Sequence, residues 1–347
     1  MCFSVCGTLT AQRIKFERYT TAEGLISDET FNLHQDRQGY IWIFSKYGTV
    51  KYDGTTFKRV LKNMPLRESF IYCIYERSDG RKWIANSNSR IYEIKNDSAF
   101  IISGLENATK VLNEHMSELS HIYVDNNENI YAISKGLCYK WIKHKSGYET
   151  LNLSYAFPAD SILYKVEDDG EYTFLSNNKK TVNSAPNGLI NMKTYIAVTR
   201  KKTTSLLRNS LPDYNLANPY HTLRNLKKYG SDYYCMISNG LVRIGEDNKI
   251  AVFMLPETIL CFTRDKLGHF WIGCLNGGIY ELGSDGKILN HYLEKATVSD
   301  ILIDHQNGLW VSTQGAGLFH CINTQAGGFS ESSPLGSTIT EIKEING

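Results

Sequence analysis

The sequence predicts an all-β fold, namely a β-propeller whose blades each contain four short antiparallel strands. Three observations support this prediction: a composition rich in aromatic residues and glycine, an internal repeat of about 40 residues, and alternating apolar residues inside each copy. The 347 residues include 22 Tyr, 14 Phe, 5 Trp and 27 Gly, which is typical of strands joined by tight turns. Helical solenoids and leucine-rich repeats need other periodicities, which the sequence lacks.

The charge balance excludes several other classes of protein. The 38 Lys and Arg residues nearly match the 36 Asp and Glu residues, which argues against a nucleic-acid-binding arm, a polybasic membrane anchor or an acidic tail. With 42% hydrophobic and 21% charged residues, the chain has the composition of a globular protein. No apolar run reaches the roughly 18 residues that a membrane-spanning helix needs.

An Asp-to-Trp motif defines the repeat. Asp36–Ile43 returns as Asp265–Ile272 and as Asp304–Val311, and in all three copies six positions separate the Asp from the Trp. A weaker copy begins at Asp125, a copy at Asp79 has a shorter turn, and two degenerate copies begin at Asp169 and Gly230. We expect each Asp to accept backbone N–H groups in the turn between the first two strands of a blade.

The number of blades follows from the aromatic residue that each copy places on its second strand. Seven positions carry this residue: Trp42, Trp83, Tyr131, Tyr172, Tyr233, Trp271 and Trp310. We therefore predict a propeller of seven blades within residues 12–330, and an eighth, eroded copy around Tyr195 is left open. A Gly followed by an apolar residue, as at Gly278 and Gly317, is predicted to begin the third strand of a blade.

The two ends of the chain have different predicted roles. Residues 14–19 resemble an outer strand without a blade of its own, so we expect them to complete the blade at 298–322 and close the ring. The alternative is that Phe329 supplies that fourth strand. Residues 1–11 are interpreted as the remnant of a secretory signal peptide, and residues 331–347 as a tail that resembles the start of a further blade.

These motifs resemble a known repeat. Residues 24–27, 36–43 and 48–57 together are similar to the two-component regulator propeller repeat. The copies at 259–282 and 298–322 match it well, those at 71–94 and 122–141 match in part, and the region 160–245 matches poorly.

The resemblance implies a location and partners. In that family the propellers form the periplasmic sensor of membrane-bound, often hybrid, histidine kinases, many of which respond to oligosaccharides. It therefore implies a periplasmic domain, exported by a signal peptide, that binds a small polar ligand such as an oligosaccharide. It also implies a downstream immunoglobulin-like domain and kinase domains, neither visible in this sequence, and it leaves a homodimer possible. No nucleic-acid partner is expected.

The loops between the second and third strands are the predicted ligand-binding site. In a propeller these loops, with those that join successive blades, gather at the mouth of the central channel. Here they carry amide, basic and Tyr side chains, which suit hydroxyl-rich or carboxylate-bearing ligands. The alternative is that they are polar only because they face water. The candidate residues are Lys46, Tyr47, Asn86, Asn88, Arg90, Lys135, Asn239, Asn276 and Gln314.

The sequence contains no motif that predicts catalysis, a metal site or a cofactor. The histidines form no metal-binding pair, Gly-x-Ser-x-Gly is absent, and the Asp/Gly turns lack the spacing of a calcium loop. The six cysteines outside the leader are expected to be free thiols. The repeated Trp residues are interpreted as core between blades rather than as platforms for sugar rings. Two carboxylates facing each other across the channel mouth, as glycoside hydrolysis requires, are not excluded.

Three functions follow from these patterns. The favoured hypothesis is a non-catalytic sensor propeller, in which ligand binding biases a downstream kinase that is not in this chain. A propeller polysaccharide lyase or hydrolase is the enzyme alternative. A protein-interaction propeller is the third, and it would expose a conspicuous apolar patch rather than a polar channel mouth.

Overall fold

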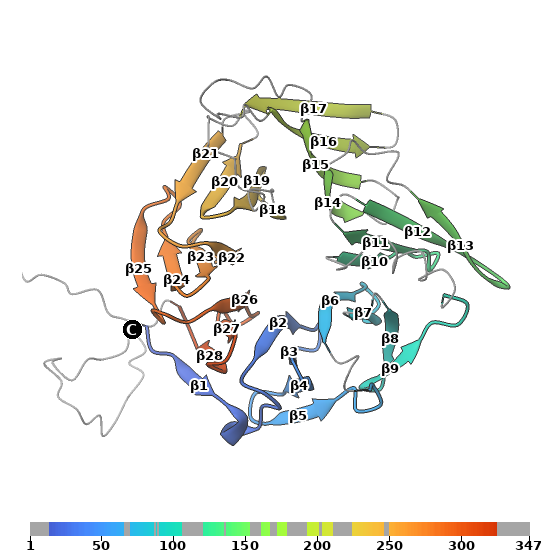
Figure 1. Ribbon diagram of the computed structural model, residues 1–347, viewed down its shortest axis with the longest axis horizontal. Helices are drawn as coiled ribbons and strands as arrows, with labels where there is room; N and C mark the ends of the chain where they lie inside the picture. Colours follow the sequence, from blue (N-terminus) through green and yellow to red (C-terminus); the bar gives the residue numbers. More distant parts are fainter. Residues whose placement is uncertain are drawn as a thin grey trace, which may run out of the picture.

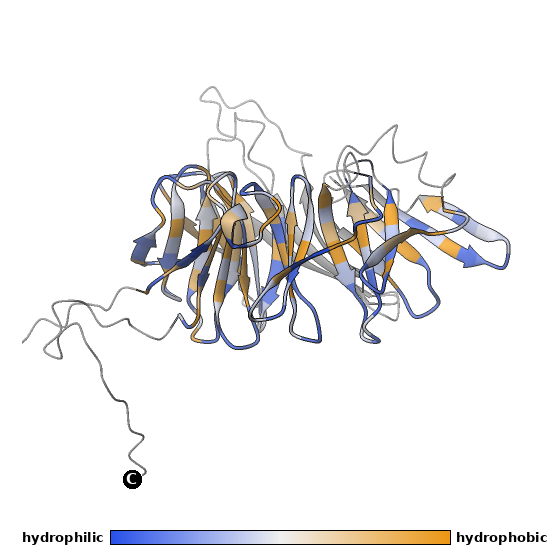
Figure 2. Cartoon of the chain, turned by 90° about the horizontal axis from the view of Figure 1, so that it is seen from below, coloured by the Kyte–Doolittle hydropathy of each residue, from blue (hydrophilic) through white to orange (hydrophobic). Residues whose placement is uncertain are grey.

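A computed structural model has the propeller fold that the repeat predicts. It describes residues 14–324 except for 66–69, 87, 89, 106–120, 135–136, 153–160, 167–171, 179–192, 201–202, 211–223 and 246–249. The described strands form seven four-stranded antiparallel sheets, each arranged like a blade around a central axis (Figure 1). Seen from the edge, the ring is a flat disc whose strands run between its two faces (Figure 2). The prediction of a β-propeller is confirmed.

We number the sheets as blades 1 to 7 in chain order. Blades 1 to 3 contain β2 (Thr30–Gln35), β3 (Ile41–Ser45), β4 (Gly48–Tyr52) and β5 (Phe57–Val60); β6 (Ile71–Glu76), β7 (Lys82–Asn86), β8 (Ile91–Lys95) and β9 (Ser98–Ile101); and β10 (His121–Val124), β11 (Ile130–Ser134), β12 (Leu137–His144) and β13 (Gly147–Asn152). Blades 4 to 6 contain β14 (Ser161–Val166), β15 (Tyr172–Asn178), β16 (Lys193–Arg200) and β17 (Thr203–Ser210); β18 (Arg224–Tyr229), β19 (Asp232–Ile237), β20 (Gly240–Ile244) and β21 (Ile250–Met254); and β22 (Ile259–Arg264), β23 (Phe270–Cys274), β24 (Gly278–Leu282) and β25 (Ile288–Tyr292). Blade 7 contains β26 (Val298–Ile303), β27 (Leu309–Thr313), β28 (Leu318–Cys321) and β1 (Glu17–Tyr19), which a short 3₁₀ helix, η1 (Thr21–Glu23), follows. Tyr195 lies in β16, so the stretch considered as an eighth copy contributes the third strand of blade 4.

Both ends of the described chain meet in blade 7. The strand β1 pairs antiparallel with β28, with Glu17 opposite His320 and Tyr19 opposite Leu318. Gly317 has a φ of +85°, and a Cβ atom there would lie 2.3 Å from the carbonyl oxygen of Tyr19, so the closing strand fits only against glycine. The prediction that residues 14–19 complete the last blade is confirmed, whereas Phe329, the alternative, lies outside the described residues.

The six-residue spacing between Asp and Trp has a direct structural cause. One carboxylate oxygen of Asp36 accepts the backbone N–H of Tyr40, and the other accepts the indole N–H of Trp42 at 2.9 Å. The same indole hydrogen bond is 3.1 Å long in blade 6 and 2.8 Å long in blade 7. One side chain thus caps the turn and satisfies the polar atom of a buried ring, which a buried N–H requires.

The repeated Trp side chains form the cores between neighbouring blades. Trp42, Trp83, Trp271 and Trp310 are only 0–3% exposed. Each belongs to an apolar cluster with the next blade: Trp42 lies with Ile84 of blade 2, and Trp310 of the last blade lies with Ile41 of the first. The core interpretation of these residues is confirmed, because rings buried this deeply cannot stack on a ligand.

Blade 2 departs from the motif, and the prediction of a shorter turn at Asp79 is wrong. Its turn is not shorter: the backbone N–H of Arg77 bonds to the carbonyl of Arg81, as Asp36 does to Tyr40, and Arg77 stands six positions before Trp83. The Arg77 guanidinium, at 5% exposure, occupies the place of the usual carboxylate and lies 5.4 Å from the centre of the Trp83 ring. Asp79 is the nearest acidic residue in the turn and therefore resembles the motif residue in the sequence, although Arg77 holds that position.

The innermost strands are joined across blades by polar side chains. An oxygen of Asp300 on β26 accepts the backbone N–H of Leu33 on β2 at 2.9 Å, so blade 7 holds blade 1. The amide of Asn32 on β2 donates to the carbonyls of Ile71 and Tyr72, so blade 1 holds blade 2. These contacts satisfy backbone groups that the inner edge of each sheet would otherwise leave unpaired.

Candidate functional site

One face of the disc carries both the loops between the second and third strands and the connections between blades. The backbone N–H of Lys46 bonds to the carbonyl of Glu29, which lies in the connection that leads into the same blade. Leu275 bonds in the same way to Thr258, and Gln314 to Thr297. We call this the loop face; the Asp-to-Trp turns lie at the other ends of the strands.

Four of the predicted site residues form a continuous arc over blades 6, 7 and 1. The Lys46 ammonium lies 3.0 Å from the carboxylate of Glu29 and 5.6 Å from the centre of the Tyr47 ring. Glu29 pairs as an isolated bridge with Gln314. Gln314 in turn bonds through its backbone to Thr297, and the Thr297 hydroxyl donates to the Asn276 side chain at 2.7 Å. Lys46, Tyr47, Asn276 and Gln314 are all exposed.

The other predicted residues have different surroundings. Asn86 is 1% exposed, and its side-chain oxygen accepts the backbone N–H groups of Asn88 and Arg90, so it holds the loop of blade 2 from below. Asn88 and Arg90 themselves are exposed. The Asn239 amide donates to the Leu255 carbonyl, which ties the loop of blade 5 to the following connection. Lys135 lies outside the described residues.

The charges on the arc are balanced. The hydrogen bond that the exposed Lys46 ammonium donates to the carboxylate of Glu29 raises the pKa of Lys46 above its usual value, so Lys46 stays charged at neutral pH. Because Glu29 already partners it, the pair presents a donor and an acceptor to a ligand rather than a bare cation. Such a surface suits neutral polyhydroxy compounds as well as acids.

The structure also shows residues that the sequence analysis missed. Phe31 on β2, Phe70 immediately before β6, and Tyr72 on β6 have adjoining rings, with centroids 4.4 Å and 5.1 Å apart along the series. All three are partly exposed. No motif marks them, because Phe31 and Tyr72 lie inside strand patterns in which an aromatic residue is ordinary and Phe70 lies in a variable connection.

Metal-ligand clusters and cysteine thiols are two sources of chemistry that the described residues can be searched for. No group of three or more His, Cys, Asp or Glu side chains within them is placed to hold a metal ion. The described cysteines Cys73, Cys235, Cys261, Cys274 and Cys321 are free thiols. Burial raises the pKa of Cys73, Cys235 and Cys274 to about 12, which removes the reactive thiolate at neutral pH.

Comparison with known proteins is informative at the level of the fold. Neither a family model nor a curated protein matches the sequence. The extracellular domain of the hybrid two-component system BT3049 from B. thetaiotaomicron is similar at a TM-score of 0.61 with 17% identity, over 89% of this chain and 42% of that one. The extracellular domain of BT4673 from the same organism has a TM-score of 0.63 with 13% identity, over 89% of this chain and 40% of that one. The chain therefore spans less than half of these sensor structures.

A third solved structure shares the fold but belongs to an enzyme. Virginiamycin B lyase from Staphylococcus aureus is similar at a TM-score of 0.59 with 14% identity, over 89% of this chain and 99% of the lyase. Identities this low show the fold alone. The likeness to extracellular sensor propellers of two-component systems, which the repeat predicts, is thus confirmed as a likeness of fold. Within the described residues, no helix is long and apolar enough to cross a membrane.

Proposed function

We propose that this chain is the periplasmic, ligand-sensing propeller of a two-component system, and that it binds an oligosaccharide on the loop face without converting it. The observation that supports this proposal is the arc of exposed Lys, Tyr, Asn and Gln side chains that crosses three blades at one end of the channel. The extracellular domains of BT3049 and BT4673 supply the analogy to sensing. The kinase that would receive the signal is not part of this chain.

The arc suits a sensor because it spans more than one blade. A ligand can shift a conformational equilibrium only by as much as it prefers one state over the other. A ligand held by Lys46 of blade 1, Gln314 of blade 7 and Asn276 of blade 6 would favour one relative placement of those blades. Blade 7 also holds both ends of the described chain, so a change there would reach the segments that precede Ile14 and follow Thr324.

The test is a thermal-shift titration of the whole chain with a panel of defined oligosaccharides, accompanied by an assay for new reducing or unsaturated sugar ends. A ligand that binds the folded state raises the melting temperature with concentration. Lys46→Ala and Asn276→Ala should each weaken binding about tenfold, which corresponds to the loss of roughly one good hydrogen bond, with little change in the melting temperature of the free protein.

Lys266→Ala is the matched control. Its ammonium donates to the carbonyl of His305 at 3.3 Å, in a contact between two Asp-to-Trp turns at the other end of the strands. It should therefore bind as the parent protein does. Equal affinity in Lys46→Ala, Asn276→Ala and the parent would move the site away from the arc.

The enzyme reading is the second candidate, because the likeness to virginiamycin B lyase extends over nearly the whole of both chains. The appearance of new sugar ends during the titration would replace the sensor proposal by that of a glycan-degrading propeller.

A further inference from the structure

The aromatic residues Phe31, Phe70 and Tyr72 occupy the inner rim of the loop face between blades 1 and 2. Phe31 and Tyr72 are the second residues of β2 and β6, the innermost strands of these two blades, which lie side by side at the centre of the ring (Figure 1). Phe70 precedes β6 directly and lies between the other two, with ring centroids 4.4 Å from Phe31 and 5.1 Å from Tyr72. The ring planes are inclined by 47° between Phe31 and Phe70 and by 66° between Phe70 and Tyr72, and we call these three contacting side chains the aromatic rim.

The aromatic rim lies outside the apolar clusters described for the junctions next to blades 1 and 2. The apolar clusters around Trp310, Trp42 and Trp83 fill the junctions on both sides of blades 1 and 2, and none of them includes Phe31, Phe70 or Tyr72. The three rings are partly exposed, whereas the four repeated Trp side chains are buried. Partly exposed aromatic side chains that touch one another outside a core are typical of binding surfaces.

The repeat itself shows that the aromatic rim is a local departure. Phe70 stands seven positions before the turn residue Arg77, and the same position holds Glu29, Thr258 and Thr297 in blades 1, 6 and 7. Phe31 and Tyr72 stand five positions before their turn residues, where blades 6 and 7 have Leu260 and Ser299. The fold therefore accepts a polar residue at the position of Phe70, and an aromatic ring there needs another reason.

Polar candidate residues flank the aromatic rim on both sides. Thr30 pairs with Ser45, which places the neighbouring Phe31 beside the loop that carries Lys46. Ile71 pairs with Asn86, which places Phe70 and Tyr72 beside the loop that carries Asn88 and Arg90. The three rings thus lie between an ammonium group on one side and an amide and a guanidinium group on the other. This arrangement suits a small amphipathic molecule.

We infer that Phe31, Phe70 and Tyr72 form the stacking subsite for one pyranose ring of the glycan, with Lys46 on one side and Asn88 and Arg90 on the other. This inference rests on the proposed function. A pyranose has an apolar face of C–H groups that loses its water on an aromatic ring, while its equatorial hydroxyls reach sideways to donors and acceptors. A protein partner fits less well, because a stable protein interface buries about 800 Å² of surface on each partner, which is more than three side chains provide.

The test replaces Phe70 by the residue that the repeat uses elsewhere. Phe70→Thr should fold, since Thr258 and Thr297 occupy this position in blades 6 and 7, and Phe70→Trp should keep a stacking surface. Phe100→Ala, at a 49% exposed aromatic on the outer strand of blade 2, is the control. Affinities for cellotetraose, mannotetraose and a galacturonate tetramer are measured by calorimetry, with the melting temperature of each free variant.

We expect at least one of these glycans to bind the parent protein, Phe70→Trp and Phe100→Ala alike, and to bind Phe70→Thr at least tenfold more weakly. Equal binding by Phe70→Thr would overturn the stacking subsite and leave the sensor proposal standing. A collapse of the melting temperature in Phe70→Thr would also overturn it, because the ring would then be structural. Absence of binding by the parent to all three glycans would overturn the subsite and the oligosaccharide proposal together.

Discussion

The junction between blades 7 and 1 and the junction between blades 2 and 3 use the same turn in opposite ways. In blade 7 the carboxylate of Asp304 lies under Trp310 and accepts its indole N–H. In blade 2 the guanidinium of Arg77 takes that place under Trp83 and donates to the backbone carbonyl of Asp125 in blade 3 at 2.9 Å. Both blades therefore keep a buried charged side chain between the turn and the aromatic ring, but the sign of its charge differs.

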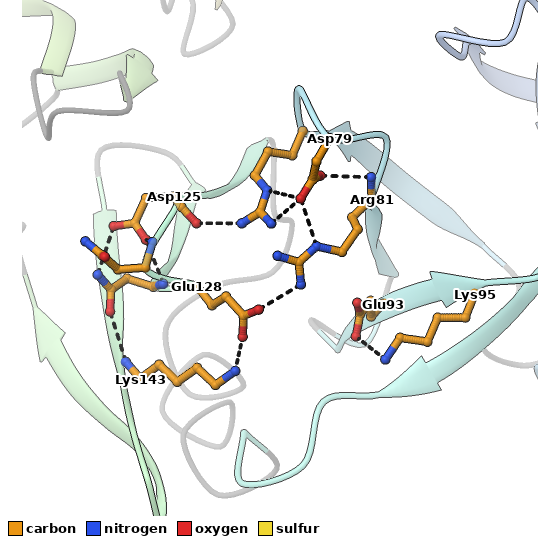
Figure 3. A network of polar contacts seen from close by, with 10 residues as sticks. Asp79, Arg81, Glu93, Lys95, Asp125, Glu128 and Lys143 are labelled. Atoms are coloured by element: carbon orange, nitrogen blue, oxygen red, sulfur yellow. Dashed lines mark hydrogen bonds and ion pairs between the residues drawn. The ribbon is translucent and has the colours of Figure 1, made fainter.

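The exchange alters what holds the neighbouring blades together. The carboxylate of Asp79 pairs with the buried guanidinium of Arg77. Asp79 also pairs with Arg81, Arg81 pairs with Glu128, and Glu128 pairs with Lys143 (Figure 3). The groups other than Arg77 are partly exposed, and ion pairs between such groups contribute about 0–1 kcal/mol each. Within blade 7, Tyr19 stacks on Trp310 with ring centroids 6.2 Å apart, and it meets Phe57 of blade 1 edge to face with centroids 5.2 Å apart.

The largest expected effect is that of Asp304→Ala. It leaves the buried Trp310 indole and the backbone N–H groups of Gln306 and Gly308 without their acceptor. We expect the free energy of unfolding to fall by about 3–5 kcal/mol, measured by urea denaturation. Asp285→Ala, which removes an exposed turn acceptor of blade 6, is the control and should change the free energy of unfolding much less. Similar losses in the two variants would contradict the role given to the Asp-to-Trp bond.

Arg77→Ala should have an intermediate effect of about 2 kcal/mol, since it removes the hydrogen bond to the Asp125 carbonyl, the ion pair with Asp79 and the contact with Trp83. The double variant Arg77→Asp with Asp79→Asn restores the motif of the other blades and removes the repulsion between two acids. It should recover most of that loss in the same urea experiment. A double variant no more stable than Arg77→Ala would mean that blade 2 depends on the contact with Asp125 rather than on filling the site under the ring.

The smallest expected effect is a pH dependence at blade 7. Burial lowers the pKa of His320 below its usual 6.5, although Asp304 and Glu17 face it and oppose the shift. The folded protein then binds this proton more weakly than the unfolded chain does, so the full stability of the fold is present above pH 6.5 and decreases as the pH falls from 6.5 through the lower pKa of the folded state. Burial lowers the pKa of His34 as well, in the same direction.

His320→Phe keeps a ring on Trp310, which His320 stacks at 3.7 Å, and removes the titration. The melting temperature of this variant should fall less than that of the parent between pH 7.5 and pH 5.5. His305→Asn, in an exposed turn of the same blade, is the control. If the parent and His320→Phe had the same pH dependence, His320 would not be its cause.

The spacing of six positions between Asp and Trp predicted the fold well, because the hydrogen bond between these two side chains fixes that spacing. A hydrogen bond from Trp310 to Asp304 tolerates little change in the length of the turn, so the motif stays visible in the sequence. The order of the closing strand was also predictable, since residues 14–19 had no blade of their own. The role of Arg77 was not predictable, because a cation replaces the usual anion at the motif position while the backbone stays the same. Residue identity alone cannot show that the two residues occupy the same place.

The candidate site was predictable only in outline. The polar loops follow from the repeat, and the structure places Lys46, Gln314 and Asn276 on one arc, although their role in binding stays a prediction. The burial of Asn86 depends on the fold of its own loop, which composition does not report. Phe31 and Phe70 are 39 positions apart and meet only because two blades adjoin, so no local pattern could have joined them.

The pairing of β1 with β28 also determines the order in which the protein can be completed. Arg18 donates to the carbonyl of Ala316, 298 positions later, so the first strand has no partner until nearly the whole described chain has been synthesised. At about 5–20 residues per second this interval is roughly 15–60 s. During it β1 is an unpaired strand, and its short length with exposed Glu17 and Arg18 reduces the risk that it pairs with another chain. Of the described strands, β1 is thus synthesised first and paired last.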